Sequence, residues 1–244
     1  MTKVACIIPA RIGSTRLPDK PLKLIEGIPL IVWVLRNAEA SGAFDEIHVA
    51  TDDTRIADAV NNAGGHAVMT SPDHTSGTDR VFEVAKQCDA THFVNIQGDE
   101  PRIPHDLLRT FATELKQIDD NTLLTIVSHA TIEEKSNPNV VKAVLDRRRN
   151  ALYFSRSPIP FERDTVAPAL RHTGIYGFSK KSLERFCSFP PGELEQTERL
   201  EQLRALENGM TISCLVHDFE SIGIDTQEEL EQFRTMMAGN RYGH

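Results

Sequence analysis

A segment near the amino terminus gathers side chains that bind anions. Residues 9–21 read PARIGSTRLPDKP, in which Gly13 lies among three cations and two hydroxyls: Arg11, Arg16, Lys20, Ser14 and Thr15. Backbone N–H groups next to a glycine, together with guanidinium and ammonium groups, neutralise phosphate oxygens. The segment contains neither a Walker A loop nor the G-x-G-x-x-G dinucleotide motif. It predicts a site for a multiply charged anion, and the alternative is a solvated basic loop.

Two aspartates follow apolar runs elsewhere in the chain. Asp99 comes shortly after the run at 92–96, and Asp225 follows Ile222-Gly223-Ile224. A carboxylate at the carboxyl end of a strand projects toward a ligand in an open α/β sheet. An isolated Asp is more often a turn or helix-cap residue. The residues alone leave a metal ligand and a cap open at both positions.

The surrounding pattern predicts the elements that position these residues. Short apolar runs alternate with segments of helical period, which is typical of a parallel sheet covered by helices. The predicted strands up to residue 100 are 4–8, 46–50, 67–69 and 92–96. The predicted helices between them span about 31–41, 54–62 with Thr54 as its cap, and 78–88. The carboxyl ends of such strands meet at one edge, so the basic segment and Asp99 should lie near each other.

Beyond residue 100 the pattern is looser. Strands are predicted at 123–127, 140–145, 171–178 and 211–216, and helices at 193–207 and 226–236, the latter capped by Thr226. Between them, 151–156 is aromatic-rich and 158–168 is a proline-broken loop. The predicted fold class is α/β, with a doubly wound, mostly parallel Rossmann-like sheet in one domain over residues 1–244.

Composition excludes several classes of protein. Lys plus Arg number 27 and Asp plus Glu 35, a net charge of −8, which argues against a broad nucleic-acid surface. The four cysteines, Cys6, Cys88, Cys187 and Cys214, form no C-x-x-C pair and are predicted to be buried free thiols. No window approaches 18 apolar residues, so we expect no membrane span and a cytoplasmic protein.

Several blocks of the sequence resemble one enzyme family. The first is IIPARIGSTRLPDKPL, and the others follow in the family's order: ATDD, SGTDR, NIQGDEP, NPNVVKAVLD, ALYFSR, RHTGIYGF, LEQLRALENG and GIDT. Together they resemble the 3-deoxy-manno-octulosonate (Kdo) cytidylyltransferases over nearly the whole chain. The resemblance implies that CTP and Kdo react with Mg²⁺ as cofactor to give CMP-Kdo and pyrophosphate, for lipopolysaccharide biosynthesis. It also implies a homodimer, without nucleic-acid or membrane partners, and an inserted region at about 130–205 for sugar binding and dimerisation.

The resemblance also implies roles for individual residues. The catalytic group comprises Arg11, Lys20, Asp99 and Asp225, of which Asp99 and Asp225 would hold the metal; Arg16 is expected to pair structurally. CTP would be bound by Ala10, Arg11, Gly13, Ser14, Thr15, Lys20, Thr51, Asp52, Ser76, Gly77, Arg80 and Gln97. Ser76 suits a helix cap as well, and Arg80 either a base contact or a surface ion pair. The sugar acid would be bound by Gln97, Arg156, His172, Tyr176, Glu201 and Gln202, with Arg156 as the carboxylate fork.

Other readings stay open at this point. Asp19 stands where the family usually has Gly, and its carboxylate either weakens the hold of Lys20 on phosphate or points to solvent. A related acid such as 8-amino-Kdo is an alternative substrate. A sialic-acid cytidylyltransferase, a sugar 1-phosphate nucleotidyltransferase and a non-catalytic nucleotide-binding regulator are more distant alternatives.

Overall fold

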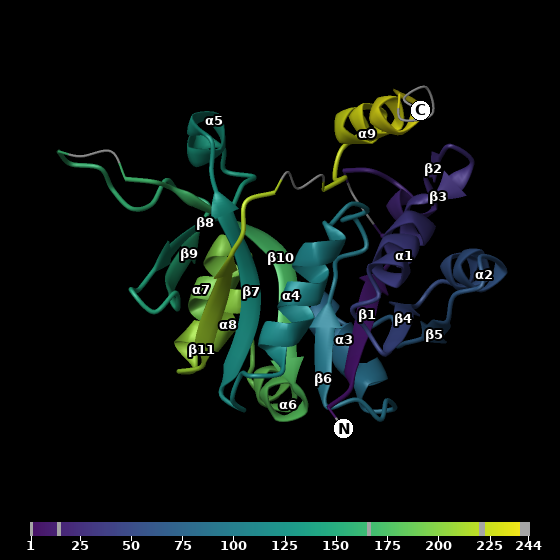
Figure 1. Ribbon diagram of the computed structural model, residues 1–244, viewed down its shortest axis with the longest axis horizontal. Helices are drawn as coiled ribbons and strands as arrows, with labels where there is room; N and C mark the ends of the chain where they lie inside the picture. Colours follow the sequence, from purple (N-terminus) through teal and green to yellow (C-terminus); the bar gives the residue numbers. More distant parts are fainter. Residues whose placement is uncertain (1, 14–15, 165–166, 220–222, 240–244) are drawn as a thin grey trace. The chain divides into compact units, whose positions relative to one another are not determined.

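The computed structural model describes residues 2–13, 16–164, 167–219 and 223–239 (Figure 1). The chain divides into two compact units. The first comprises residues 1–112 and 220–244, and the second comprises 113–219. The predicted inserted region, about 130–205, falls within the second unit.

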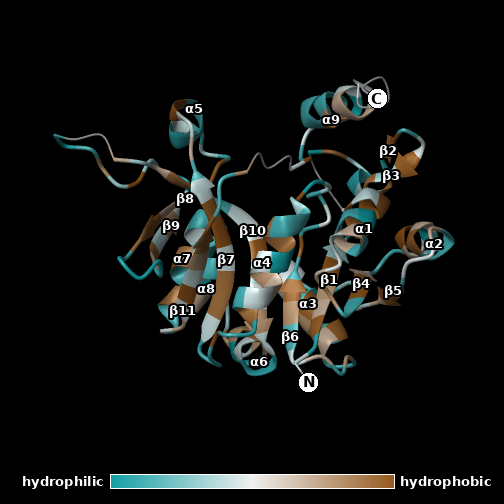
Figure 2. Ribbon diagram, in the orientation of Figure 1, coloured by the Kyte–Doolittle hydropathy of each residue, from teal (hydrophilic) through white to brown (hydrophobic). Residues whose placement is uncertain are grey.

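The first unit is built on a parallel sheet of order β6-β1-β4-β5. Its strands are β1 (Val4–Ala10), β4 (Glu46–Thr51), β5 (Ala67–Met69) and β6 (His92–Asn95). Every residue of β1 is buried, as expected of a central strand with neighbours on both edges. Figure 2 shows hydrophobic residues along β1 and both polar and apolar residues on α2 (Thr54–Asn62).

The first unit also contains a hairpin and several helices. They are the 3₁₀ helix η1 (Lys20–Leu22), the hairpin β2 (Leu24–Ile25) and β3 (Ile28–Pro29), and the helices α1 (Leu30–Ser41), α3 (Gly77–Ala85) and α9 (Gln227–Gly239). Helix α1 ends where Gly42 takes φ 62°, a left-handed conformation that glycine adopts without strain. Helix α4 (His105–Leu115) begins in this unit and was not predicted.

The second unit combines parallel and antiparallel pairs. Its sheet contains β7 (Thr122–His129), β8 (Lys142–Leu145), β9 (Ala151–Ser155), β10 (Leu170–Ser179) and β11 (Thr211–Val216). Strand β7 pairs in parallel with β11 and antiparallel with β10, and β8 is antiparallel to both β9 and β10. Helices α5 (Ile132–Ser136), α6 (Lys180–Ser188), α7 (Glu193–Glu198) and α8 (Gln202–Glu207) complete it. The α/β fold with a mostly parallel sheet is thus confirmed.

Two local predictions need correction. Thr54 is the first residue of α2, and its cap is Asp53, whose Oδ1 accepts from the Arg55 N–H at 2.9 Å. The single helix expected over 193–207 is two helices, because Arg199 takes φ 54° between them. This break lets Arg204 form a buried ion pair with Glu195 at 2.6 Å.

All four cysteines were predicted to be buried, but only two of them are. Cys6 and Cys214 are buried, whereas Cys88 and Cys187 are partly accessible, and all four are free thiols. Burial raises the pKa of the Cys214 thiol to about 12. Within the described ranges no helix is both long and apolar enough to cross a membrane.

Candidate active site

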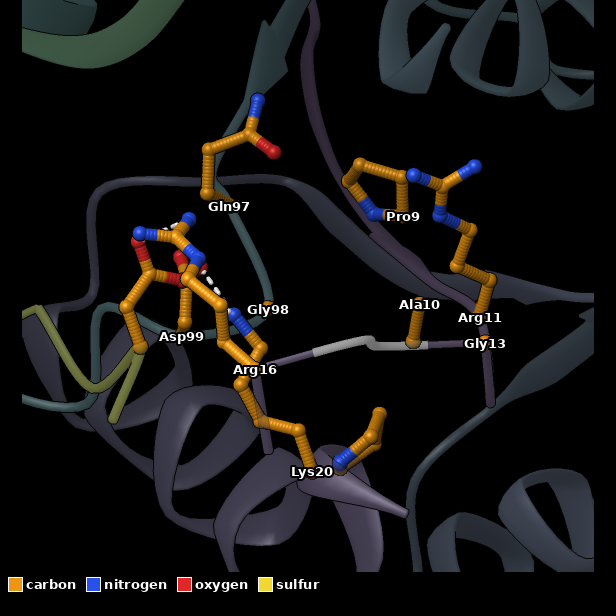
Figure 3. A pocket seen from close by; sticks show the side chains of 11 residues that line it. Pro9, Ala10, Arg11, Gly13, Arg16, Lys20, Gln97, Gly98 and Asp99 are labelled. Atoms are coloured by element: carbon orange, nitrogen blue, oxygen red, sulfur yellow. Dashed lines mark hydrogen bonds and ion pairs between the residues drawn. The ribbon is translucent and has the colours of Figure 1, made fainter. Parts of the chain in front are cut away.

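A cavity of about 320 Å³ opens at the carboxyl end of β1 (Figure 3). Its lining comes from the end of β1, the basic segment, η1, the turn after β6 and the segment before α9: Pro9, Ala10, Arg11, Gly13, Arg16, Lys20, Pro21, Gln97, Gly98, Asp99 and Asp225. A Cβ on Gly98 would lie 2.9 Å from the Pro9 carbonyl oxygen. Only glycine therefore lets the turn carrying Asp99 approach β1 so closely.

Lys20 bridges the two predicted metal carboxylates. Its Nζ donates to Asp99 Oδ2 at 2.6 Å and to Asp225 Oδ1 at 2.8 Å, and its side chain is 15% exposed. The backbone aids this convergence, since the Ile224 N–H donates to the Asp99 carbonyl oxygen at 3.0 Å. Burial opposes the charged form of Lys20, but the two carboxylates outweigh it and hold the pKa of Lys20 above its usual value.

The same balance acts on Asp225. Burial favours its neutral form, but Lys20 and Arg16 outweigh that effect and hold the pKa of Asp225 below its usual value. Arg16 donates from Nη2 to Asp225 Oδ2 at 2.8 Å, so its predicted structural pairing is confirmed. Both carboxylates are therefore directed at one cationic point beside the cavity.

Arg11 is arranged differently from the other two cations. It is exposed, and it forms no hydrogen bond or ion pair with another described residue through its side chain. Figure 3 shows it across the cavity from Asp99 and Arg16. Its guanidinium is available to a ligand without breaking a contact within the described chain. Ser14 and Thr15, also predicted to bind CTP, lie outside the described residues.

A second cavity of about 160 Å³ shares part of its wall with the first. Its lining is Pro9, Ala10, Arg11, His74, Thr75, Ser76, Gly77, Arg80 and Gln97. Ser76 caps α3 by accepting from the Asp79 N–H at 3.1 Å, as the sequence predicts. A Cβ on Gly77 would meet Pro9 Cγ at 3.3 Å and Gln97 Oε1 at 3.6 Å. The cavity therefore faces the amino end of a helix, where N–H groups favour anions and carbonyl oxygens.

Arg80 forms a buried ion pair, so the predicted surface ion pair is wrong. Its side chain is 4% exposed, and its guanidinium donates to Thr70 Oγ1 at 2.5 Å and to Asp52 Oδ2 at 3.2 Å. The other carboxylate oxygen, Asp52 Oδ1, is buried and has no hydrogen-bond partner among the described residues. Neighbouring Thr51 is fully buried, and its hydroxyl accepts from the Asp53 N–H at 3.2 Å. Neither Thr51 nor Asp52 lines either cavity.

Three of the predicted sugar residues form one hydrogen-bonded chain in the second unit. Tyr176 Oη donates to Gln202 Oε1 at 3.0 Å, and Gln202 Nε2 lies 3.4 Å from His172 Nδ1. His172 Nε2 lies 2.8 Å from Thr125 Oγ1, which donates to the Ile175 carbonyl oxygen at 2.8 Å. These directions are mutually consistent when His172 is neutral with its proton on Nε2.

The pKa values agree with that neutral state. Burial lowers the pKa of His172 to about 3. Burial also raises the pKa of Tyr176 well above its usual value, and the charge of nearby Glu201 adds to the effect. The His172, Tyr176 and Gln202 side chains therefore offer neutral donors and acceptors at physiological pH, which suits hydroxyl groups.

Arg156 is held separately from that chain of residues. Its Nε donates to the Glu198 carbonyl oxygen at 2.9 Å, and its Nη1 donates to the Pro138 carbonyl oxygen at 3.2 Å. The Glu198 carboxylate accepts from Ser155 Oγ at 2.6 Å and from the Arg156 N–H at 3.0 Å. The guanidinium is thus fixed along one edge, while Nη2 takes no part in these bonds.

Lys142 is a supporting residue that the sequence reasoning missed. It is fully buried, and its ammonium donates to the carbonyl oxygens of Asn137 at 2.8 Å, Val140 at 2.6 Å and Arg156 at 2.5 Å. Burial, aided by the charge of Arg156, lowers the pKa of Lys142. A lysine inside the apolar run VVKAVL was the available signal, since a buried ammonium must bind fixed acceptors.

Asp19 adopts a backbone conformation that glycine takes without strain. Its φ is 52° and ψ 33°, in the left-handed region. Its Oδ1 lies 3.6 Å from Arg55 Nη1. The carboxylate is therefore directed at α2 rather than at Lys20 or at solvent alone, which answers the question left by the sequence.

The first unit thus brings Arg11, Lys20, Asp99 and Asp225 to one cavity, and Ser76, Gly77 and Arg80 to the next, with Gln97 lining both. The second unit joins His172, Tyr176 and Gln202, with Glu201 nearby. Arg156 has an anchor of its own. The binding roles of these residues stay predictions.

Comparison with known proteins places this geometry in a family. A profile of the cytidylyltransferase family matches residues 5–212. A 3-deoxy-manno-octulosonate cytidylyltransferase of Syntrophobacter fumaroxidans is 44% identical, with 99% of each chain covered. One of Thermodesulfovibrio yellowstonii is 42% identical, covering 93% of this chain and 94% of that relative.

Solved structures agree with the sequence relatives. The structure of a CMP:2-keto-3-deoxy-manno-octonic acid synthetase complexed with CTP has a TM-score of 0.93 and 39% identity, covering 98% of this chain and 100% of that one. A nucleotidyl transferase of Methanothermobacter, at 13% identity and a TM-score of 0.65, shares the fold alone. On the extent and identity of these matches, the chain belongs to the 3-deoxy-manno-octulosonate cytidylyltransferase family.

Proposed function

We propose that this protein transfers the cytidylyl group of CTP to Kdo, giving CMP-Kdo and pyrophosphate. The observation that carries the proposal is the cavity at the end of β1, where Lys20, Asp99 and Asp225 converge opposite the uncommitted Arg11. Such an array neutralises a triphosphate and holds a cation beside it. Family membership supplies the substrates.

The reaction places defined demands on these side chains. The anomeric hydroxyl oxygen of the sugar acid bonds to the α-phosphorus, the bond from that phosphorus to the bridging oxygen breaks, and the hydroxyl proton is lost to solvent. Negative charge then grows on the departing pyrophosphate. Arg11 and Lys20 lie on the cavity wall and would bind that charge more strongly as it develops.

The carboxylates fit the magnesium ion that the family implies. Asp99 and Asp225 direct one oxygen each at a single point, now held by the Lys20 ammonium, and hard oxygen ligands are what Mg²⁺ prefers. Bound there, Mg²⁺ would neutralise triphosphate charge and acidify a coordinated hydroxyl. Lys20 keeps two like charges close together in the free enzyme, and its ammonium becomes available to phosphate when another cation replaces it.

The smaller cavity suits the cytosine base. Gln97 and the amino end of α3 face it with amide donors and acceptors. Gln97 Nε2 donates to Asn95 Oδ1 at 3.3 Å, so the Gln97 Oε1 atom is the acceptor that this side chain can offer to a base. A cytosine amine is a donor where uracil has a carbonyl oxygen, so an acceptor here would favour CTP over UTP.

The polar residues of the second unit suit the sugar acid. We propose that His172, Tyr176, Gln202 and Glu201 bind its hydroxyls, and that the free edge of the Arg156 guanidinium binds its carboxylate. The sugar carboxylate needs its own cation because it is brought toward a triphosphate of the same sign.

The test is turnover by the full-length protein. With CTP, Kdo and Mg²⁺, we expect release of one pyrophosphate per CMP-Kdo formed, identified by mass spectrometry, and at least tenfold lower kcat/KM with UTP. 8-amino-Kdo, a nine-carbon sialic acid and a sugar 1-phosphate are compared at equal concentration. Faster turnover of one of these would reassign the substrate, whereas CTP binding without pyrophosphate release from any of them would identify a non-catalytic regulator.

We also propose a homodimer formed through the second unit. Ile132 and Phe161 are 87% and 88% exposed, and Leu152 is 61% exposed, which is unusual for large apolar side chains. Alanine and proline residues, including Pro158, Ala167 and Pro168, make up half of the lining of a cavity of about 660 Å³ beside Ile132. Lys135 forms an ion pair with Glu162, which fixes the proline-broken loop against α5.

Light scattering coupled to size-exclusion chromatography tests the dimer. The wild type should elute at twice the 27.2 kDa chain mass, and Ile132→Asp combined with Phe161→Asp should elute as a monomer. Leu24→Asp, at an apolar residue 52% exposed in the first unit, is the matched control and should stay dimeric. A dimeric double variant would rule out this surface. The cytoplasmic location and the role in lipopolysaccharide biosynthesis remain predictions.

A further inference from the structure

Three metal-ligating side chains gather at the edge of the first unit's sheet that lies opposite the active-site cavity. Glu46 and His48 stand at the beginning of β4, and Cys88 follows the end of α3. One ligand atom from each lies within 4.8 Å of the others. Thr51 lies at the other end of β4, and Gly77, at the other end of α3, lines the second cavity of the active site. The cluster is therefore separate from the proposed catalytic machinery.

The fold brings these side chains together for simple reasons. Glu46 and His48 are two residues apart on a strand, so they project from the same face of the sheet. Helix α3 packs against β1 and β4, and the turn after it places Cys88, whose N–H donates to the Ala85 carbonyl oxygen at 3.3 Å. All three residues are partly accessible, so an ion from solvent can reach them.

The donor set selects a class of metal. A thiolate, an imidazole and a carboxylate together suit Zn²⁺ and similar borderline ions, and are poor ligands for Mg²⁺. A tetrahedral zinc ion requires ligand atoms about 3.3–3.8 Å apart. The ligand atoms must therefore move closer by about 1 Å, and Cys88 Sγ must exchange its hydrogen bond to the Val84 carbonyl oxygen, at 3.4 Å, for the ion. Three protein ligands leave one position for water.

A fourth residue, His66, orients the histidine ligand. His66 precedes β5, beside β4, and its Nδ1 lies 2.8 Å from His48 Nδ1, while His48 Nε2 lies 3.3 Å from Glu46 Oε2. Two facing ring nitrogens bond only if one carries the proton. If His48 Nε2 binds a metal, its proton sits on Nδ1 and is donated to His66, the outer contact that metal-binding histidines normally make.

We propose that Glu46, His48 and Cys88 form a second metal site, for Zn²⁺ or a similar divalent ion, with His66 as its positioning residue. The ion links the start of β4 to the end of α3. Because the ion binds the folded state, it stabilises the first unit in proportion to its concentration. It has no role in cytidylyl transfer, so the activity should not depend on it.

Cobalt spectroscopy on the untagged, metal-stripped protein tests the site, with excess Mg²⁺ present. We expect one Co²⁺ per chain, a thiolate-to-cobalt absorption band and its loss on adding Zn²⁺. Cys88→Ser should abolish the band, and Glu46→Gln should weaken Co²⁺ binding at least tenfold. Cys187→Ser, at the other partly accessible cysteine, and Asp99→Asn are matched controls and should keep the wild-type band. His66→Gln should keep the band but bind about 10–100-fold more weakly, as expected of an outer contact.

Two results would overturn the proposal. One is a thiolate band that persists in Cys88→Ser or is absent from the wild type. The other is alkylation of Cys88 by iodoacetamide at the same rate with and without Zn²⁺ in the wild type, followed by mass spectrometry with Cys187 as internal control. The alkylation measurement needs no variant, so it decides the question even if the substituted proteins fold poorly.

Discussion

The active-site cavity of the first unit and the polar chain of the second handle charge in opposite ways. In the cavity, Lys20 keeps a raised pKa and Asp225 a lowered one, so both stay ionised although partly removed from water. In the second unit, burial lowers the pKa of His172 to about 3 and raises that of Tyr176, so both stay neutral. The cavity therefore concentrates charge, whereas the chain of His172, Tyr176 and Gln202 is neutral.

This difference matches the two substrates proposed. A triphosphate needs fixed cations and a metal, because its charge increases during the reaction. A polyhydroxylated acid needs many neutral hydrogen bonds and one cation. Substitutions in the two regions should therefore affect different kinetic constants.

The largest effect is expected from the two carboxylates. Asp99→Asn and Asp225→Asn should each lower kcat at least about a hundredfold, the scale of losing one electrostatic contact to a developing charge. The variants keep the side-chain shape, and Asp106→Asn on α4 is the control for a carboxylate outside the cavity. The kcat of each variant is measured by steady-state kinetics at saturating Mg²⁺. Rates close to wild type would exclude these residues as metal ligands.

In the second unit, Gln202→Ala should raise the KM for the sugar acid at least tenfold with a smaller change in kcat, because it removes the partner of both Tyr176 and His172. Tyr176→Phe, which loses only the hydroxyl, should give a smaller rise in the same constant. Gln196→Ala, at a glutamine whose side chain bonds only locally to Pro191, serves as control. An unchanged KM for the sugar acid in Gln202→Ala would separate this chain of residues from the substrate.

The neutral state of His172 predicts a dependence of stability on pH. Its folded pKa of about 3 lies below the usual value of 6.5, so the unfolded chain binds a proton that the folded protein does not. The stability that this group contributes is present above pH 6.5 and is lost as the pH falls toward 3. Between pH 6.5 and 5 the loss amounts to roughly 1.5 kcal/mol for one group. We expect the free energy of unfolding, measured with urea, to fall less between pH 6.5 and 5 in His172→Gln than in the wild type or in a His105→Gln control. The same fall in all three proteins would contradict the neutral assignment of His172.

The smallest effect is expected at Asp19. Asp19→Gly relieves the left-handed conformation at φ 52° but increases the freedom of the unfolded chain, so the free energy of unfolding should change by less than about 1 kcal/mol. Activity should stay within about twofold, because the carboxylate faces Arg55 and not Lys20. A large gain in CTP affinity would instead show that Asp19 competes with phosphate for Lys20.

Much of the first unit's sheet could be predicted from sequence. Apolar runs mark its strands, so β5 matches its predicted bounds and β1, β4 and β6 differ at one end only. In the second unit, β11 also matches its predicted bounds. The single helix predicted over 193–207 failed because its break depends on tertiary contacts. The left-handed Arg199 and the buried pair of Arg204 with Glu195 leave the spacing of leucines unchanged.

The candidate site was predictable where its residues share a strand edge. Lys20 and Asp99 follow the carboxyl ends of β1 and β6, and both contact Asp225 or each other at that edge of the sheet. Lys142 left a signal, a lysine inside an apolar run, but the sequence did not show that its ammonium holds the Arg156 carbonyl oxygen. Glu198 left no such signal, because its contacts with Arg156 join residues 42 positions apart in the chain. The buried state of Arg80 was missed for the same reason, since its partners lie 10 and 28 residues away.

Calorimetric titration of CTP without the sugar acid tests the central claim, that the first unit's cavity holds the nucleotide independently of the second unit's polar chain. In the presence of Mg²⁺, Arg11→Ala should bind CTP at least about tenfold more weakly than the wild type, a loss of roughly 1.4 kcal/mol. Gln202→Ala should bind it within about threefold, or roughly 0.7 kcal/mol. If Gln202→Ala lost CTP binding while Arg11→Ala kept it, the assignment of the two substrates to the two regions would be wrong.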